Sequence, residues 1–499
     1  MVLGYLEILI LIPLLAAVGI LLGLQARPVA IVAALANLLW GVFVWMNFDA
    51  TQPKGLAPQM PNPERIIFAD PKIALSLGLD GMSLVLALLT VIVTLAAVWM
   101  TPGRSLTGAQ ARLYYASPLL IGAGALGAFL STDLFFFFAF HELALIPTFL
   151  MIGMMGHGED RIGAAWKITI YLSLGSLVLL AGLLALVEAS GVNSFGMADL
   201  EAAAAKGVFG AETQKWIYLT LLIGFGVLIA LFPFHSWAAP AYAAAPTPVA
   251  MMHAGVLKKF GLYGLLRVAM PLLPLGHQAW ANWILVLLLG NILYVGLITI
   301  VQDRLDKMLG FSSVMHMGYV FLGIAAANPI GLNGAVLLMF AHGVSIALLF
   351  ALAGELRKDV PTLDMTTMGG LGKSAPVLCF LFAFASFASI GLPGFANFAS
   401  EVMVFFGGFK DYHGGPLGAL QITTVLALWG VVISAVYMLR AFRHIFQGEA
   451  VSNRKVSDVG VTGRLAAGML VLVLLVAGIY PSLLLDVLPG SVQVILGQR

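Results

Sequence analysis

The sequence predicts an all-α polytopic membrane protein with about 14 transmembrane helices. Hydrophobic residues make up 61% of the 499 positions and charged residues only 10%, and the mean hydropathy is +1.01. Soluble domains carry about 25% charged residues, so a soluble globule is excluded. The apolar runs are long and continuous rather than short and alternating, which favours helices over an outer-membrane barrel.

The predicted spans follow one another through short loops, so we expect one membrane bundle without a separate soluble domain. The spans cover residues 2–23, 27–47, 80–101, 113–131, 134–155, 165–189, 216–235, 246–272, 277–300, 307–327, 330–355, 375–406, 420–444 and 462–486. The loops after odd-numbered spans carry most of the Lys and Arg residues. The positive-inside rule therefore places these loops in the cytoplasm and both termini outside.

Ionisable side chains inside the predicted spans are the candidate functional residues. A charge at mid-bilayer costs about 2.5–3.5 kcal/mol even on the lenient insertion scale, so such residues indicate function or pairing. The candidates are Glu7, Glu142, His235, His253, Lys258, Lys259, His316, His342 and Glu401. Glu7 alone is expected near the outer end of its helix, without a functional role.

Glu142 lies within the apolar stretch DLFFFFAFHELALIPTFLMIG. An acidic residue in this setting predicts a buried functional carboxylate. The preceding His141 points about 100° away on a regular helix, so the two residues share only part of a face. Pro147 weakens the helix locally and can leave room for water.

Two adjacent lysines and a histidine occur in HAGVLKKFGLYG, residues 253–264. On a regular helix His253 and Lys259 are separated by about 9 Å of rise and about 120° of rotation, so they would flank one hydrated path without touching. Lys259 is expected to relay protons, a role that suits a buried lysine. For Lys258 two interpretations stay open: a second relay group, or a side chain that snorkels to the headgroups.

His316 and His342 are each a single histidine on an apolar helix. Taken alone, each is typical of a hydrogen-bonded core residue. Two such histidines, together with a lysine and two carboxylates in one chain, favour a series of proton sites.

Two interruptions of the apolar pattern predict broken helices. Gly391, Pro393 and Gly394 lie in the middle of the predicted span 375–406, shortly before Glu401, and SWAAPAYAAAPTP occupies residues 236–248. Broken helices in transporters expose backbone groups to a water-filled cavity. Two of them in one chain favour an inverted-repeat transporter.

Sequence signatures of cofactor sites are missing. The sequence contains no P-loop, no GxGxxG after a strand, no cysteine cluster and no HExxH, and it shows no basic surface with interleaved aromatic residues. We therefore expect no cofactor or metal in this chain and no nucleic-acid partner.

The ordered set of motifs resembles a known family. FHELALIPTFLMIG, PFHSWAAPAYAAAPTP, AGVLKKFGLYGLLR, FSSVMHMGYVFLGI, AHGVSIALLFALAGELR and ASIGLPGFANFASE are similar to the antiporter-like subunits of respiratory complex I, NADH-quinone oxidoreductase, and most of all to their M type, called chain 4. The resemblance extends from about Asp80 to Arg443. Mrp-type antiporter subunits and membrane-bound hydrogenase subunits share the same core.

The resemblance implies a fold with two inverted five-helix repeats, in which helices 7 and 12 are broken. It divides the chain into four parts. These are residues 1–112 with helices 1–3 and a periplasmic loop, residues 113–272 with the first repeat, residues 273–445 with the second repeat, and residues 446–499 with a loop and helix 14.

The resemblance also implies a function. The chain would move protons across the membrane, driven by electron transfer from NADH to quinone in other subunits, and would itself perform no redox chemistry. NADH, FMN, iron-sulfur clusters and quinone would belong to partner subunits. The implied neighbours are L-type and N-type antiporter-like subunits in the lipid bilayer of a bacterial cytoplasmic (inner) membrane.

Five candidate residues match the family's proton-relay positions. Glu142 corresponds to the glutamate of span five, Lys259 to the lysine of span eight, His316 and His342 to the central histidines, and Glu401 to the acidic residue of span twelve.

One departure from the family pattern affects the first repeat. The family has a lysine seven positions before the histidine of its Pro-x-His-x-Trp motif; here the histidine is His235 and the earlier position is Leu228. Our hypothesis is that His253, His141 or Lys258 replaces that lysine, and His235 is a further possible relay group. The rival hypothesis is that the first half is impaired and that Lys259, His316, His342 and Glu401 work alone.

Two other functions remain open from the sequence. One is a subunit of an Mrp-type cation/proton antiporter or a membrane-bound hydrogenase. The other is a structural spacer that no longer pumps protons, which the missing lysine at position 228 would favour. Retention of five costly ionisable residues argues against the spacer.

Overall fold

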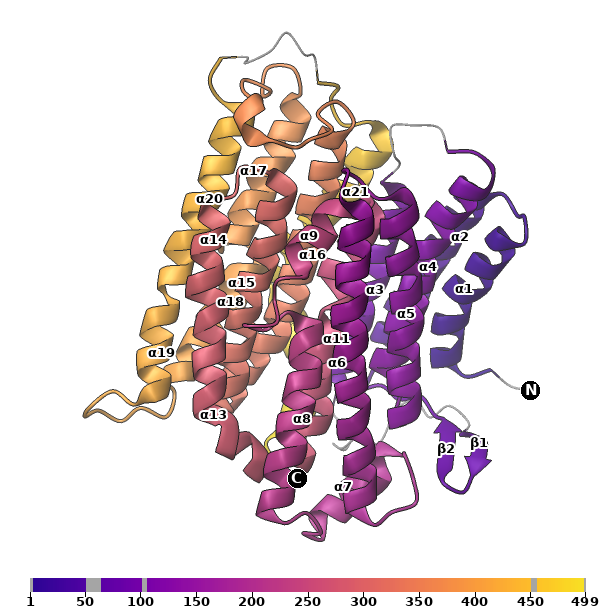
Figure 1. The fold of residues 1–499 in the computed structure, drawn as a ribbon, viewed down its shortest axis with the longest axis vertical. Helices are drawn as coiled ribbons and strands as arrows, with labels where there is room; N and C mark the ends of the chain where they lie inside the picture. The colour runs from indigo at the N-terminus through magenta and orange to yellow at the C-terminus, as the bar shows by residue number, and fades with distance from the viewer. Residues whose placement is uncertain (1–2, 51–63, 101–105, 450–455, 498–499) are drawn as a thin grey trace.

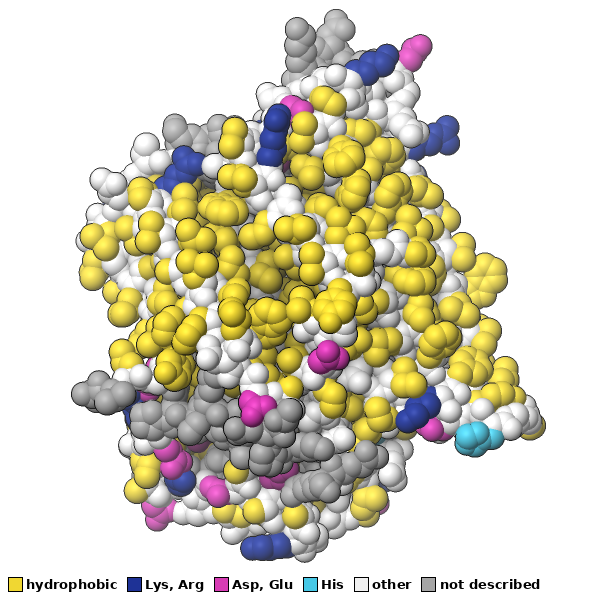
Figure 2. All heavy atoms as spheres, turned by 180° about the vertical axis from the view of Figure 1, so that it is seen from behind, with side chains coloured by type: hydrophobic (Ala, Val, Ile, Leu, Met, Phe, Trp, Pro, Cys, Tyr) yellow, Lys and Arg dark blue, Asp and Glu magenta, His cyan; other side chains and the backbone are white. Residues whose placement is uncertain are grey.

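The computed structural model describes residues 3–50, 64–100, 106–449 and 456–497, which form a bundle of long helices (Figure 1). Ten helices in this described part are long and apolar enough to cross a membrane. Figure 2 shows a broad hydrophobic band across one face of the molecule, with most charged side chains on that face toward its two ends. The predicted all-α membrane fold is therefore confirmed.

The first part of the chain carries a small hairpin among its helices. In order it contains α1 (Tyr5–Leu21), α2 (Ala26–Met46), β1 (Arg65–Ala69), β2 (Lys72–Leu75), α3 (Gly81–Trp99), α4 (Gly108–Leu130), α5 (Leu134–Met155), α6 (Arg161–Ser190), α7 (Met197–Ala205), α8 (Ala211–Ile229), α9 (Ala238–Ala244), α10 (Thr247–Met252), the π segment η1 (His253–Leu257), α11 (Lys259–Gly264), the π segment η2 (Leu265–Ala269) and α12 (Met270–Leu272).

The second part contains helices and connecting loops, and no named strand lies among its described residues. It contains α13 (Pro274–Leu289), the π segment η3 (Gly290–Val295), α14 (Gly296–Ile300), α15 (Leu305–Ala326), α16 (Pro329–Arg357), the 3-10 turn η4 (Met365–Thr367), α17 (Pro376–Ile390), α18 (Ala396–Phe409), α19 (Ala419–Ala427), α20 (Trp429–Phe446), α21 (Val461–Ile479), α22 (Ser482–Leu485) and α23 (Pro489–Ile495). Each predicted span coincides with one or more of these helices.

The first predicted helix break is present but begins earlier than expected. Ala230 adopts a left-handed conformation with φ 65° directly after α8, and regular helix resumes only at Ala238. The interruption therefore starts inside the predicted span 216–235, and His235 lies in the irregular segment rather than on a helix. Pro233 explains the shift, because proline has no N–H to continue the helix and its ring clashes with the preceding turn.

The second predicted break is confirmed. Gly391, with φ 81°, ends α17, and Gly394 has φ 97° before α18 begins at Ala396. Both conformations lie in the region that only glycine adopts without strain.

The segment from Thr247 to Leu272 is not the regular α-helix that the sequence analysis assumed. Two π segments, η1 and η2, interrupt it. Each π turn adds a residue to the helix turn and so rotates the following side chains away from α-helical positions. Residues 248–270 are all buried, which places this helix in the centre of the bundle.

The hairpin of β1 and β2 and the short helix α7 were not predicted, because each is too short to give a strong periodic pattern. The hairpin is joined to α1 by an ion pair. Arg65 on β1 donates through Nε to Glu7 Oε1 at 2.8 Å and through Nη2 to Oε2 at 2.9 Å. Glu7 lies in the first turn of α1, as expected. Its role is therefore an ion pair at a helix end.

Candidate functional site

Lys259 lies at the centre of the bundle and contacts both halves of the chain. Its side chain is 0% exposed. The ammonium Nζ donates to the carbonyl of Ala254 at 2.6 Å and lies 3.1 Å from Nδ1 of His342 on α16. The predicted central lysine therefore has a direct hydrogen-bonded neighbour that can exchange a proton.

The two predicted histidines lie side by side beyond Lys259. The rings of His316 and His342 are 5.3 Å apart between centroids. His316 contacts two backbone carbonyls, with Nδ1 2.8 Å from Ser312 O and Nε2 3.0 Å from Ser389 O. Since a carbonyl only accepts, the His316 ring is able to hold a proton on either nitrogen.

Glu401 faces the break between α17 and α18. Its side chain is buried, and Oε1 has no hydrogen-bond partner among the residues that the structure describes. A Cβ built on Gly391 would lie 2.6 Å from Glu401 Oε2. The glycine that ends α17 therefore leaves the space in which the carboxylate lies.

Lys258 is buried as completely as its neighbour, and the snorkelling interpretation is wrong. It is 1% exposed, and its Nζ donates to Ser313 Oγ on α15 at 3.1 Å. The same Nζ lies 5.0 Å from the centre of the Tyr242 ring. The Tyr242 hydroxyl is in turn 3.3 Å from Nδ1 of His253. Lys258 and His253 thus share one tyrosine.

Glu142 and His141 form a close pair at the side of the bundle. Glu142 Oε1 is 3.4 Å from His141 Nδ1, which is within ion-pair distance. Glu142 was predicted to be a buried carboxylate; in the structure Oε1 is buried, but the side chain as a whole is 36% exposed. The reason is its helix face: Ile146, one turn later on α5, is 58% exposed on the same side.

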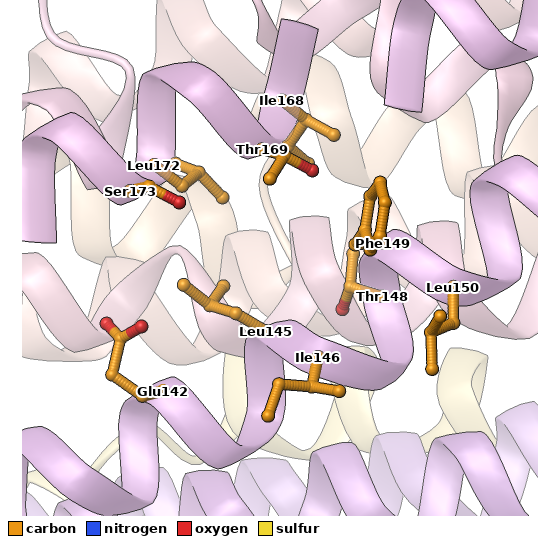
Figure 3. Close-up of a pocket in the computed structure, with 10 residues that line it drawn as sticks. All are labelled: Glu142, Leu145, Ile146, Thr148, Phe149, Leu150, Ile168, Thr169, Leu172 and Ser173. Atoms are coloured by element: carbon orange, nitrogen blue, oxygen red, sulfur yellow. The ribbon is translucent and has the colours of Figure 1, made fainter. Parts of the chain in front are cut away.

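A pocket of about 280 Å³ opens beside Glu142 between α5 and α6 (Figure 3). Thr148, Thr169 and Ser173 add polar groups to an otherwise apolar lining. Figure 3 shows the Glu142 carboxylate pointing from α5 toward the part of α6 that carries Leu172 and Ser173. The carboxylate therefore lies at the edge of the chain rather than at its centre.

His235 stands apart from the other predicted relay residues. Its ring stacks on Phe232 at 5.6 Å and meets the edge of Tyr294 at 6.0 Å. Its Nδ1 has no hydrogen-bond partner among the described residues, and neither ring neighbour is a predicted relay residue. Leu228 is 4% exposed and packs in the apolar core.

The sequence analysis missed a partly buried ion pair that joins distant segments. Arg267 on η2 donates to Asp80, the N-terminal cap of α3, at 2.5 Å. Burial pushes the pKa of Asp80 upward, but the Arg267 guanidinium and hydrogen bonds from Ser83 outweigh it and hold the pKa below its ordinary value. The capping pattern of Asp80 and Ser83 was visible in the sequence; the arginine partner was not.

A second buried cluster was also missed. Asp306, at the start of α15, is 1% exposed and accepts hydrogen bonds from Arg304 at 2.7 Å and from Arg357 at 2.8 Å. Arg357 also donates to the carbonyl of Ala243 at 3.3 Å. The cluster connects the end of α16 to the segment that follows the first helix break.

Metal-binding chemistry is not indicated by the described residues. No group of three or more His, Cys, Asp or Glu side chains there is arranged to hold a metal ion. The structure instead brings Lys259, His342 and His316 into contact inside an apolar bundle, while Glu401 and Glu142 lie in separate surroundings. All of these side chains belong to types that are able to take up and release protons.

Known proteins share this architecture and sequence. Residues 131–427 match the family described as NADH:quinone oxidoreductase/Mrp antiporter, TM. NADH-quinone oxidoreductase subunit M of Rhodobacter capsulatus is 31% identical over 94% of this chain and 90% of its own length. NAD(P)H-quinone oxidoreductase chain 4-2 of Synechocystis sp. is 35% identical over 89% of this chain and 78% of its own length.

A solved structure agrees with these relatives. A chain of respiratory complex I from Thermus thermophilus superimposes with a TM-score of 0.87 and 28% identity, covering 99% of this chain and 98% of that chain. The family match spans more than half of the sequence, and the relatives cover nearly all of it. The chain belongs to the NADH:quinone oxidoreductase/Mrp antiporter family of transmembrane subunits.

Proposed function

We propose that the chain is a proton-translocating membrane-arm subunit of an NADH:quinone oxidoreductase. The observation that carries the proposal is the buried contact between Lys259 and His342, at 3.1 Å, inside a chain whose relatives are named as subunits of that enzyme. A lysine and a histidine are each costly to bury in a membrane protein. Their contact at its centre therefore indicates a role in proton movement rather than in stability.

Protons would pass through the second half by way of four groups. A protonated Lys259 gives its proton to Nδ1 of His342, and His316 lies next to that ring. Glu401 is the terminal acceptor beside the broken helix. His342 Nε2 and Glu401 Oε1 have no hydrogen-bond partner among the described residues. Buried polar groups are normally hydrogen-bonded, which supports a hydrated path between them.

The first half would begin at Glu142. Its side chain is partly exposed, although Oε1 is buried, and it borders a pocket on the side of the chain. An ionisable group on a membrane-facing surface is costly unless another protein covers it. We therefore assign this face to a neighbouring antiporter-like subunit of the L or N type.

The rest of the enzyme would supply the redox chemistry. NADH, FMN, iron-sulfur clusters and quinone would be bound by partner subunits, and this chain would act on protons alone. The complex would lie in a bacterial cytoplasmic (inner) membrane. The names of the relatives favour this function over an Mrp-type antiporter, a hydrogenase subunit or a non-pumping spacer.

The decisive experiment is proton pumping by the assembled complex in vesicles, with the electron-transfer rate recorded alongside. We compare wild type with Glu142→Gln and with the control Glu212→Gln, whose carboxylate is 77% exposed at the start of α8. We expect Glu142→Gln to lose pumping and coupled turnover together while assembly is intact, and Glu212→Gln to behave as wild type. Unchanged pumping in Glu142→Gln would show that the first half of the chain does not carry protons. It would favour either a structural spacer or a subunit that works through its second half alone.

A further inference from the structure

Lys258 is the buried basic group that the proposed relay leaves without a role. It is 1% exposed, on a helix that is enclosed by protein over residues 248–270. The π segment η1 ends immediately before it. The π turn rotates the side chains that follow it. The two consecutive lysines both contact polar groups inside the bundle: Lys258 contacts Ser313, and Lys259 contacts His342.

The partners of Lys258 come from both halves of the chain. Ser313 lies on α15 in the second half and accepts from Nζ at 3.1 Å. Tyr242 lies on α9 in the first half, with its ring 5.0 Å from the same Nζ. The face of an aromatic ring attracts a cation, and the Ser313 hydroxyl accepts a hydrogen bond from either form of the amine, so this site stabilises Lys258 once a proton has arrived on it. Lys258 therefore bridges the two halves independently of Lys259.

A titratable group lies directly behind this bridge. His253 Nδ1 is 3.3 Å from the Tyr242 hydroxyl, and His253 Nε2 has no partner among the described residues. The edge of Trp237 packs on His253 at 5.6 Å, and Trp237 Nε1 donates to the carbonyl of Val227. The cluster of Lys258, Tyr242 and His253 is thereby attached to the end of α8, next to Leu228.

The partners of the two lysines give the cluster a direction, because Lys259 contacts an imidazole nitrogen, whereas Lys258 contacts a hydroxyl and an aromatic ring. Two neighbouring ammonium groups repel each other strongly where the surroundings are apolar. A proton that arrives on the neutral amine of Lys258 therefore repels the proton on Lys259. Lys259 then releases that proton to His342 Nδ1, 3.1 Å away, and one proton has entered the second half for each one received.

We infer that Lys258, held between Tyr242 and Ser313, is a proton-carrying residue that receives protons from the His253 side and drives them from Lys259 into the second half. This inference rests on the proposed proton-translocating function. It makes Lys258 the basic group of the first half, in a chain that has leucine at position 228.

The test is proton pumping by the assembled complex in vesicles, with NADH oxidation measured in parallel, for Lys258→Met and Lys259→Met. Methionine keeps the apolar stem and removes the charge. We expect Lys258→Met to lower pumping by about tenfold or more, as for loss of a proton-transfer group. Leu228→Lys added to Lys258→Met is expected to restore part of it, which a purely structural role of Lys258 does not predict.

The outcomes separate this inference from the proposed function. Wild-type pumping in Lys258→Met with loss in Lys259→Met overturns the role of Lys258 alone. Wild-type pumping in both variants overturns the proposed function as well. If Lys258→Met does not assemble, Tyr242→Phe decides, because it keeps the ring beside Nζ and removes the hydroxyl next to His253. Lower pumping in assembled Tyr242→Phe supports the inference, and wild-type pumping overturns it.

Discussion

Gly391→Ala is predicted to displace the Glu401 carboxylate without changing any ionisable group. The new Cβ would lie 2.6 Å from Glu401 Oε2, whereas ordinary contact begins at 3.4 Å. The carboxylate must therefore retreat by about 0.8 Å, and a misplacement of about 1 Å is able to slow a reaction by about 100-fold. Alanine at φ 81° also costs about 1–2 kcal/mol in the left-handed region.

Gly394→Ala supplies the matched control. Gly394 lies in the same break with φ 97°, and a Cβ there meets nothing within 4 Å. Both variants strain the backbone, but only Gly391→Ala collides with Glu401. We expect vesicle acidification driven by NADH to fall by about 10-fold to 100-fold in Gly391→Ala and to stay near wild type in Gly394→Ala.

Two outcomes would contradict this prediction. Equal losses in the two variants would mean that backbone strain, not the position of the carboxylate, limits pumping. Full pumping in both would mean that Glu401 works from a range of positions. Assembly of the complex is checked by native electrophoresis in each case.

Three further predictions concern stability, read as the melting temperature of the purified complex. Asp306→Ala leaves Arg357 without its carboxylate and should destabilise the subunit by about 3 kcal/mol; an unchanged melting temperature contradicts this. Asp80→Asn should lower the stability of the subunit by a similar amount, because Arg267 loses its negatively charged partner. Because the pKa of Asp80 is lowered, its stabilisation is complete above about pH 4 and is lost as the pH falls further, a dependence that Asp80→Asn should weaken. Gly127→Ala should lower the stability of the subunit by about 1–3 kcal/mol, because its Cβ would overlap the ring of Phe140 on α5. An unchanged melting temperature would show that α5 moves to make room.

The helices and the candidate residues were largely accessible from the sequence. Hydrophobic runs determine which segments cross a membrane, because a backbone in lipid must satisfy its own hydrogen bonds. Gly391 and Gly394 indicated the second break, since glycine tolerates left-handed conformations. The cost of burying charge singled out Glu142, Lys259 and Glu401 without any knowledge of their neighbours.

The sequence by itself thus determined the class of fold, the membrane setting and the set of ionisable groups. Only the tertiary structure decided which of them meet: Lys259 contacts His342 across 83 residues of sequence, and Lys258 contacts Ser313 across 55. It also decided that Lys258 is buried and that Glu142 is partly exposed. The physical reason is that periodicity specifies the local conformation of a helix. The partner of each helix face, and the rotation introduced by a π turn, depend on packing between segments far apart in the chain.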